Sequence, residues 1–215
     1  MWHDVEQNSD DWDVLRCDVI TMSNLAKIMA NYGAAFGAPA RKYAARIALG
    51  QLTGEVQTGG YSNTHMERGH EQEPMAVLEY EARYFTKVTN GGFYKVGDQG
   101  GSPDGLVGKP GMIEVKSAIS DIHYDRIRRQ SFDPSHKWQC LGNLKISDRD
   151  WLDFISYCID YPEGKRIFVY RFHAKDYADE FEMIDLRIEK FRALIIEAKE
   201  IILNSKYSIV EALKL

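Results

Sequence analysis

The sequence predicts an α/β fold in which helices flank a central mixed β-sheet, on three observations. Segments of helical periodicity alternate with short strand-like runs, in the order helices, several strands, two helices, two strands and a helix. The 215 residues, 44% of them hydrophobic, suit one globular domain over residues 1–215. Charged residues make up 27% of the chain, and no apolar run approaches the length of a membrane span, which argues against disorder and against a membrane protein.

The first part of the chain is expected to be mainly helical. An acidic lead segment, residues 1–11, lacks the basic and apolar regions of a secretion signal. Ser23 is of a type that caps helices, and Gly33 of a type that ends them. We therefore expect helices over Trp12–Arg16, Asn24–Asn31 and Pro39–Leu49.

A longer helix is expected over Thr64–Phe85, with Pro74 kinking it or marking a new start. Its apolar stripe comprises Glu71, Met75, Leu78, Ala82 and Phe85. A carboxylate on a core-facing stripe is costly unless a cation or a hydrogen bond compensates it. Glu71 is therefore either half of a buried ion pair or an acid of a functional site.

Turn residues then separate short strands from further helices. Strands are expected over Tyr84–Val88, Gly92–Val96, Gly105–Val107, Met112–Lys116, Trp151–Ile159 and Arg166–Phe172. Helices are expected over Asp121–Arg129, His136–Ile146 and, as a long amphipathic C-terminal helix, residues 176–206. On the second of these, His136, Gln139 and Asn143 form a polar face.

The residues that indicate chemistry are Asp104, in a Pro-Asp-Gly turn, and Glu114 and Lys116 on the strand that follows. Because alternate residues of a strand share a face, Glu114 and Lys116 point the same way, while Ile113 and Val115 point into apolar packing. Converging carboxylates with room for water suit Mg²⁺ or Mn²⁺, and a nearby lysine can act on a metal-bound water or on a phosphate. The alternative is an ordinary salt-bridged strand surface.

Five blocks, in order, make the chain resemble the phage lambda exonuclease-like group of PD-(D/E)xK nucleases, which includes YqaJ-type viral recombinases and alkaline exonucleases. The blocks are Trp12–Arg16 leading into Val19–Ser23, His70-Glu71, Ser102–Leu106, Glu114-Val115-Lys116, and His136-Lys137-Trp138-Gln139, which has His where the group has Tyr. The resemblance covers roughly Asp11–Phe172 and implies a restriction-endonuclease-like core.

The resemblance implies roles for individual residues. Asp104 and Glu114 would bind Mg²⁺, with Mn²⁺ as a substitute, and the Val115 carbonyl would be a third contact. Lys116 would position or activate the attacking water, Glu71 would complete a second metal position or hold a metal-bound water, and Gln139 would orient the nucleophile or the phosphate. Arg16, Ser23 and Ser102 would bind a terminal 5′-phosphate, as a guanidinium and two hydroxyls can.

Duplex DNA would be held by local positive charge, because the whole chain carries a net charge of −5. Between Arg126 and Lys137, four cations stand against Asp133 alone, and they are expected to contact DNA: Arg126, Arg128, Arg129 and Lys137. The alternative is an ordinary solvated loop. A ring with a basic lumen would reconcile DNA binding with the net charge, and the lambda-type enzymes are similar in being trimeric.

The resemblance implies a 5′→3′ exonuclease that degrades one strand of linear double-stranded DNA to mononucleotides. The 3′ single strand would serve phage-type recombination with a single-strand annealing protein, in the cytoplasm of a bacterial or phage-infected cell. Two alternatives remain open: another PD-(D/E)xK endonuclease or junction resolvase, and a non-catalytic DNA-end-binding recombination protein. Three widely separated cysteines favour neither disulfides nor a zinc knuckle.

Overall fold

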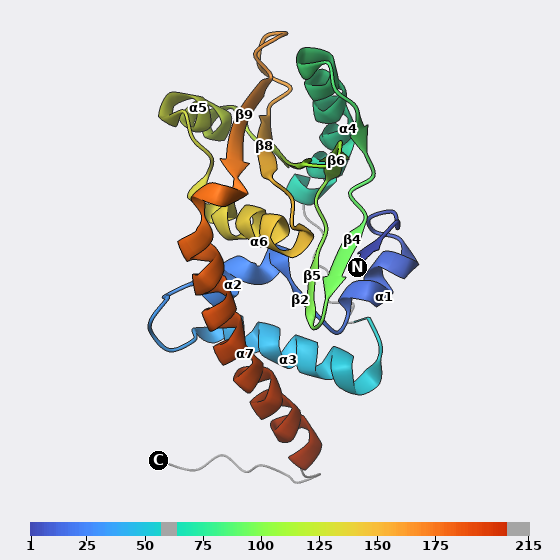
Figure 1. Ribbon diagram of the computed structural model, residues 1–215, viewed down its shortest axis with the longest axis vertical. Helices are drawn as coiled ribbons and strands as arrows, with labels where there is room; N and C mark the ends of the chain where they lie inside the picture. The colour runs from blue at the N-terminus through green and yellow to red at the C-terminus, as the bar shows by residue number, and fades with distance from the viewer. Residues whose placement is uncertain (57–63, 206–215) are drawn as a thin grey trace.

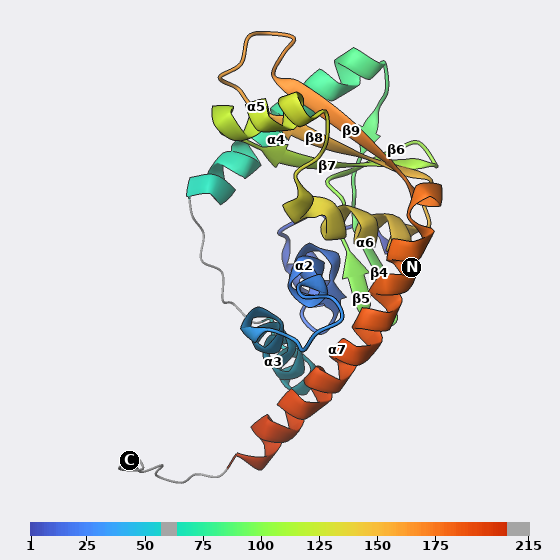
Figure 2. The ribbon, with the colours of Figure 1, turned by 90° about the vertical axis from the view of Figure 1, so that its left-hand side faces the viewer.

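A computed structural model describes residues 1–56 and 64–205, in which helices flank two mixed β-sheets (Figures 1 and 2). The predicted α/β class is confirmed, although the strands divide between two sheets rather than forming one. In chain order, with η for 3₁₀ helices, the elements are β1 (Trp2–His3), α1 (Asp10–Arg16), β2 (Ile20–Thr21), η1 (Met22–Asn24), α2 (Leu25–Met29), α3 (Ala38–Thr53), α4 (Thr64–Tyr84), β3 (Val88–Thr89), β4 (Phe93–Val96), β5 (Gln99–Gly101), β6 (Gly105–Val107), β7 (Gly111–Ser117), α5 (Ser120–Arg129), η2 (Pro134–His136), α6 (Lys137–Ser147), β8 (Trp151–Tyr157), β9 (Ile167–His173), η3 (Ala174–Asp176) and α7 (Ala178–Asn204).

The larger sheet has the order β3-β6-β7-β8-β9, with β7 and β8 parallel and the other neighbours antiparallel. Its central strand β7 is buried on both faces, as is usual for a strand covered by helices on each side. Met112 packs in the same core cluster as residues of α6, and Ile113 and Val115 pack in the same cluster as residues of α4. The alternation of the strand therefore directs Glu114 and Lys116 toward α6.

The smaller sheet has the order β1-β4-β5-β2, with β5 and β2 parallel. Only three residues, numbers 102–104, connect β5 to β6 of the larger sheet. This connection passes close to Gly91, where an added Cβ would lie 1.8 Å from the carbonyl oxygen of Pro103. A glycine at position 91 thus allows the backbone of the connection to approach closely.

The C-terminal helix α7 runs along one side of the molecule and packs against α3 and α2 (Figures 1 and 2). Its buried side chains include Ile184, Ile188, Phe191 and Ile195, which follow the predicted helical periodicity. Residue 206, the last of the predicted helix, lies outside the described residues. Within the described chain, no helix is both long and apolar enough to cross a membrane. The three cysteines are free.

The predicted orientation of α4 is wrong. Glu71 and Met75 are exposed, as are Leu78 (65%) and Phe85 (97%). The helix instead buries the face of Gln72, Ala76 and Tyr80. The physical reason is that the Tyr80 hydroxyl donates a 2.7 Å hydrogen bond to Asp153 Oδ2, which permits the burial of this polar aromatic side chain. The helix continues through Pro74, so no new helix starts there.

Two smaller expectations are also wrong. Ser23 caps no helix, because the chain enters the 3₁₀ helix η1 directly after β2 and its hydroxyl donates to Thr21 Oγ1 at 3.4 Å. Tyr84 ends α4 rather than beginning a strand, and Phe85 takes a left-handed φ of 49° before β3 begins at Val88. The short strands β1, β2 and β5 were not predicted, since two or three residues carry too little alternation to be recognised.

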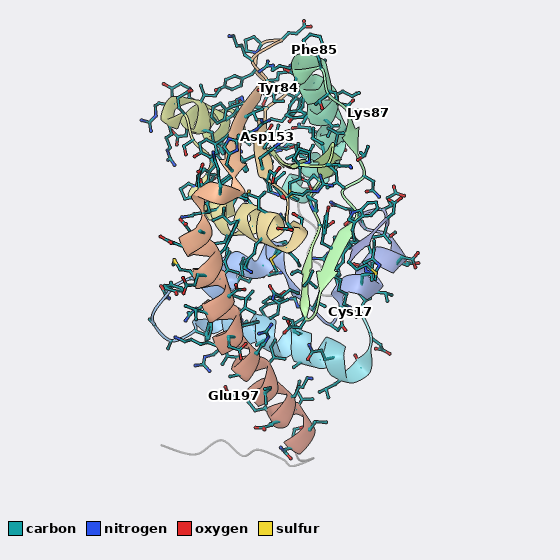
Figure 3. All side chains as sticks on the ribbon, viewed as in Figure 1. Cys17, Tyr84, Phe85, Lys87, Asp153 and Glu197 are labelled. Carbon is teal, nitrogen blue, oxygen red and sulfur yellow. The ribbon has the colours of Figure 1, made fainter. Side chains whose placement is uncertain are left out.

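An ion pair with a buried carboxylate anchors α4 to the larger sheet. Arg171 of β9 makes a bidentate pair with Asp153 of β8 (labelled in Figure 3), with N–O distances of 2.7 and 2.8 Å. The same guanidinium lies 3.8 Å above the Trp151 ring. Tyr80 therefore ties the helix to a carboxylate whose geometry is already fixed from two sides.

Replacing Tyr80 by phenylalanine should remove one hydrogen bond to a buried carboxylate while keeping the ring. We expect Tyr80→Phe to lower the free energy of unfolding by about 1.5–3 kcal/mol, the range for bonds to charged groups. Urea denaturation measures this change. Tyr84→Phe, at an exposed tyrosine whose ring packs on Tyr80, is the matched control and should change it little. Equal losses in both variants would contradict the role given to the Tyr80 hydroxyl.

Candidate active site

A cavity of about 630 Å³ opens between α1, η1, the central part of α4, β7 and the start of α6. Eight residues of the predicted site line it: Arg16, Ser23, Ser102, Asp104, Glu114, Val115, Lys116 and Gln139. The structure therefore brings together most of the predicted residues from five separate parts of the chain. Glu71 and the four cations from Arg126 to Lys137 are not among the lining residues.

Asp104 stands at the entrance to β6, and hydrogen bonds hold it against β7. Its Oδ2 accepts from the backbone N–H of Val115 at 2.6 Å, and its own N–H donates to the carbonyl of Ile113 at 3.1 Å. The Pro-Asp-Gly turn thus places the carboxylate beside the strand that carries Glu114 and Lys116.

Glu114 is fully buried and accepts hydrogen bonds from three side chains. Lys116 Nζ and Gln139 Nε2 donate to its Oε1, at 2.6 and 2.5 Å, and Asn143 Nδ2 donates to Oε2 at 3.1 Å. Gln139 and Asn143 lie one turn apart on α6, so the predicted polar face of this helix is directed at the carboxylate.

Electrostatics around this carboxylate are strongly perturbed. Burial, and then the nearby Asp104 carboxylate, raise the pKa of Glu114, against the lowering effect of the Lys116 ammonium. For Lys116, burial lowers the pKa, but the Glu114 and Asp104 carboxylates outweigh it and raise the pKa above its usual value. Lys116 is therefore a fixed cation in this state of the site.

Among the described side chains of α4, the acid that lines the cavity is Glu73, two residues after the predicted Glu71. Burial, followed by repulsion from Asp104, raises the pKa of Glu73 to about 7. Glu71 is exposed on another face of the helix, and the side chain of His70 lies outside the described residues. The sequence holds acids at both positions, and only the helix orientation distinguishes them.

His136 is a cavity residue to which no role was given from the sequence. Its ring stacks on Phe154, with centroids 5.7 Å apart. Burial, and then the cations Lys116 and Arg126, lower the pKa of His136 to about 4, so the imidazole is neutral near pH 7. Its position on the same helix face as Gln139 was the available signal.

Two of the predicted phosphate-binding residues, Arg16 and Ser102, are connected through Trp12, and all three predicted residues line the cavity. The Arg16 guanidinium lies 3.8 Å above the Trp12 ring and, within the described chain, forms no ion pair. Trp12 Nε1 donates to Ser102 Oγ at 3.0 Å, and that hydroxyl donates to the Gly92 carbonyl at 2.6 Å. The hydroxyl proton of Ser102 is thus already donated to the Gly92 carbonyl, whereas the Arg16 guanidinium is available to bind an anion.

The four predicted DNA-binding cations differ from expectation, because each of them pairs with an acid, in three cases one from outside the counted stretch. Arg126 is only 5% exposed and donates to Ser156 and Asp133, so it supports the η2 turn rather than a surface. Arg128 and Arg129 are exposed but pair with Asp125. Lys137 Nζ lies 2.9 Å from Glu180 Oε1. Because the Arg126 side chain is buried, it is not available to contact DNA in this structure.

The donor set suits a hard divalent cation. Asp104, Glu114 and Glu73 supply carboxylates that repel one another in the absence of a cation, as the raised pKa values of the two glutamates indicate. The Val115 carbonyl adds a neutral oxygen donor. Among the side chains that the structure describes, no three acidic, histidine or cysteine groups are already close enough to enclose an ion.

Comparisons with known proteins identify a family for this chain and solved structures of similar fold. The model of the family described as "YqaJ-like viral recombinase domain" matches residues 11–150. The structure is similar to an alkaline exonuclease from Laribacter hongkongensis, LHK-Exo, with a TM-score of 0.76 and 27% identity over 91% of this chain and 98% of that one. LHK-Exo in complex with dAMP gives the same TM-score at 28% identity, with the same coverage.

A phage-related exonuclease from Haemophilus somnus shares the fold at 15% identity, with a TM-score of 0.69, over 89% of this chain and 98% of that chain. No curated protein sequence matches this chain.

The raised pKa of Glu73 predicts a specific pH dependence in the metal-free protein. The folded state holds a proton on Glu73 up to about pH 7, whereas the unfolded state releases it near 4.5, so this contribution to stability falls as pH rises between the two values. We expect Glu73→Gln, which cannot ionise, to gain stability relative to wild type between pH 5 and pH 8.

Urea denaturation in EDTA at several pH values measures this difference. The lowered pKa of His136 acts in the opposite direction between about 4 and 6.5, but it is common to both proteins and cancels. Glu71→Gln is the matched control, since that carboxylate is exposed. A Glu73→Gln difference that does not change with pH would contradict the assignment.

Proposed function

The chain belongs to the family of YqaJ-like viral recombinase domains, and from this premise we propose that it is a Mg²⁺-dependent 5′→3′ exonuclease acting on linear double-stranded DNA. A role as a DNA exonuclease, with an α/β fold of the PD-(D/E)xK type, follows from the family and from the similarity to alkaline exonuclease structures. The proposal takes residues 1–215 as one exonuclease domain.

One observation carries the proposal: Asp104, Glu114, Lys116 and Glu73 line a single open cavity that also contains Arg16. A salt-bridged strand surface, the alternative for these residues, needs neither a fully buried Glu114 nor a third carboxylate from α4. A non-catalytic DNA-end-binding protein needs no such set of acids.

The cation, Mg²⁺ or Mn²⁺, would be held by Asp104, Glu114 and the Val115 carbonyl, with Glu73 in the place first given to Glu71. When bound, it supplies an activated water and stabilises charge on the phosphate. Lys116 borders the cavity and is held at Glu114 Oε1, so its ammonium would donate hydrogen bonds to the attacking water or to a phosphate oxygen. Gln139 holds Glu114 through its amide N–H, leaving its carbonyl oxygen to orient the nucleophile.

The polarity of cleavage is proposed from Arg16. A guanidinium without an ion pair among the described residues, braced on the Trp12 ring in the same cavity as the acids, suits a terminal 5′-phosphate. Ser23 and Ser102 would add hydroxyls, Ser102 after its hydrogen bond to Gly92 changes. The complex of LHK-Exo with dAMP is consistent with release of mononucleotides.

The wider setting is also proposed. A 3′ single strand left by such cleavage would pass to a single-strand annealing protein during phage-type recombination. A homotrimeric ring is supported by the exposed apolar residues Met75 and Leu78 of α4 and Phe85 just after it (labelled in Figure 3), which a free monomer would leave in water. Of the four basic residues, Arg128 and Arg129 remain available to DNA once Asp125 releases them, and Lys137 is held by Glu180.

Replacing Lys116 by alanine should abolish cleavage while leaving DNA-end binding largely intact, because the lysine acts on the reacting groups. Gel electrophoresis of a 5′-phosphorylated linear duplex and a closed circle, with Mg²⁺ and then with EDTA, measures this. Wild type should degrade only the linear duplex, and only with Mg²⁺. Lys109→Ala, at an exposed lysine, is the control. Wild-type rates for Lys116→Ala, or cleavage of the circle, would contradict the proposal, and the latter would favour an endonuclease.

Replacing Arg16 by alanine should selectively reduce the preference for 5′-phosphorylated over 5′-hydroxyl ends. We expect a fall of about tenfold or more, as for the loss of a charge-assisted hydrogen bond. Initial rates on the two matched duplexes give the ratio. Arg16→Lys, which keeps the charge but loses the bidentate fork, should be intermediate. An unchanged ratio in Arg16→Ala would rule out the phosphate role.

A further inference from the structure

Asn143 is a buried polar residue beside the candidate active site that does not line the cavity. It lies on α6, one turn after Gln139, and only 1% of it is exposed. Its Nδ2 donates a 3.1 Å hydrogen bond to Glu114 Oε2, the carboxylate oxygen that neither Lys116 nor Gln139 contacts. The Asn143 side chain thus contacts the Glu114 carboxylate from the side that faces away from the cavity.

The other half of the same amide is unsatisfied. Asn143 Oδ1 is buried and has no hydrogen-bond partner among the described residues. A buried acceptor left unpaired loses its hydrogen bonds to water without replacement, so its presence requires an explanation. Turning the amide over would not help, since Oδ1 would then face Glu114 Oε2 and two acceptors would meet.

The surroundings of Oδ1 are fitted to this orientation. A Cβ at Gly101 would lie 2.7 Å from Oδ1 and 2.9 Å from the Cγ2 of Ile146, so a glycine at position 101 leaves the space that the amide occupies. The other two side-chain atoms nearest to this point, from Ile146 and Met22, are apolar. Within the described residues, the N–H group is therefore the part of the Asn143 amide that makes a hydrogen bond.

We infer that Asn143 is a positioning residue: its N–H fixes the Glu114 carboxylate in the orientation that presents it to the divalent cation. Lys116 and Gln139 both act on Oε1 and both border the cavity, where substrate and solvent compete for them. Asn143 is the donor to Glu114 that lies away from the cavity, so it holds the carboxylate whatever occupies the site. Such outer contacts typically change metal affinity or activity by 10–100-fold.

This inference rests on the proposed function, because it assumes that Glu114 binds the cation. The test is Asn143→Leu, which has the same branched shape and removes both the N–H donor and the unpaired oxygen. Electron paramagnetic resonance of Mn²⁺ added to the DNA-free protein measures the affinity of the metal site independently of cleavage. We expect Mn²⁺ to bind at least 10-fold more weakly to Asn143→Leu than to wild type, and raised Mg²⁺ to restore part of the lost cleavage.

Thermal unfolding in EDTA separates positioning from simple loss of structure. Ile146→Val, which alters packing at the same point without touching Glu114, is the control and should bind Mn²⁺ as wild type does. If Asn143→Leu does not fold, Asn143→Ala is read in the same way. Unchanged Mn²⁺ affinity in a folded Asn143 variant would overturn this inference alone. Absence of Mn²⁺ binding to wild type would overturn the proposed metal site and the inference together.

Discussion

The structure of the candidate site depends on one constraint: a fully buried carboxylate, Glu114, must be compensated on both oxygens. A buried charge is tolerated only when it is paired and hydrogen-bonded. The strand β7 brings Lys116 to one side of it, and α6 brings two amides to the others. The helix α6 therefore cannot shift along the sheet without leaving a donor or acceptor unpaired, and its position in turn places His136 on the wall of the cavity.

Local sequence patterns sufficed for the centre of the site. Asp104 in its turn and the alternation of Glu114 with Lys116 depend on a few consecutive residues, and the observed β6 and β7 agree with the predicted strands. The long helices were also predictable, because their periodicity extends over several turns.

What the sequence could not supply are the partners that arrive from elsewhere in the chain. The stripe containing Glu71 was predicted to face the core from its helical spacing alone. The helix is oriented instead by Tyr80, whose hydrogen bond goes to Asp153 on a distant strand. The positive charge counted between Arg126 and Lys137 ignored Asp125 and Glu180, which lie just outside that stretch or far along the chain. The face of a helix and the net charge of a surface are tertiary properties, and both errors have this origin.

The short connection between the two sheets has a consequence for the length of the product. The guanidinium proposed to grip the end of a strand stands beside the smaller sheet, the cleaving groups belong to the larger one, and three residues that include Pro103 join them. Proline restricts the backbone, and Asp104 is bonded to the neighbouring strand. The distance between the Arg16 guanidinium and the acidic residues is therefore set by the protein scaffold. The enzyme would release products of constant length, independent of their bases.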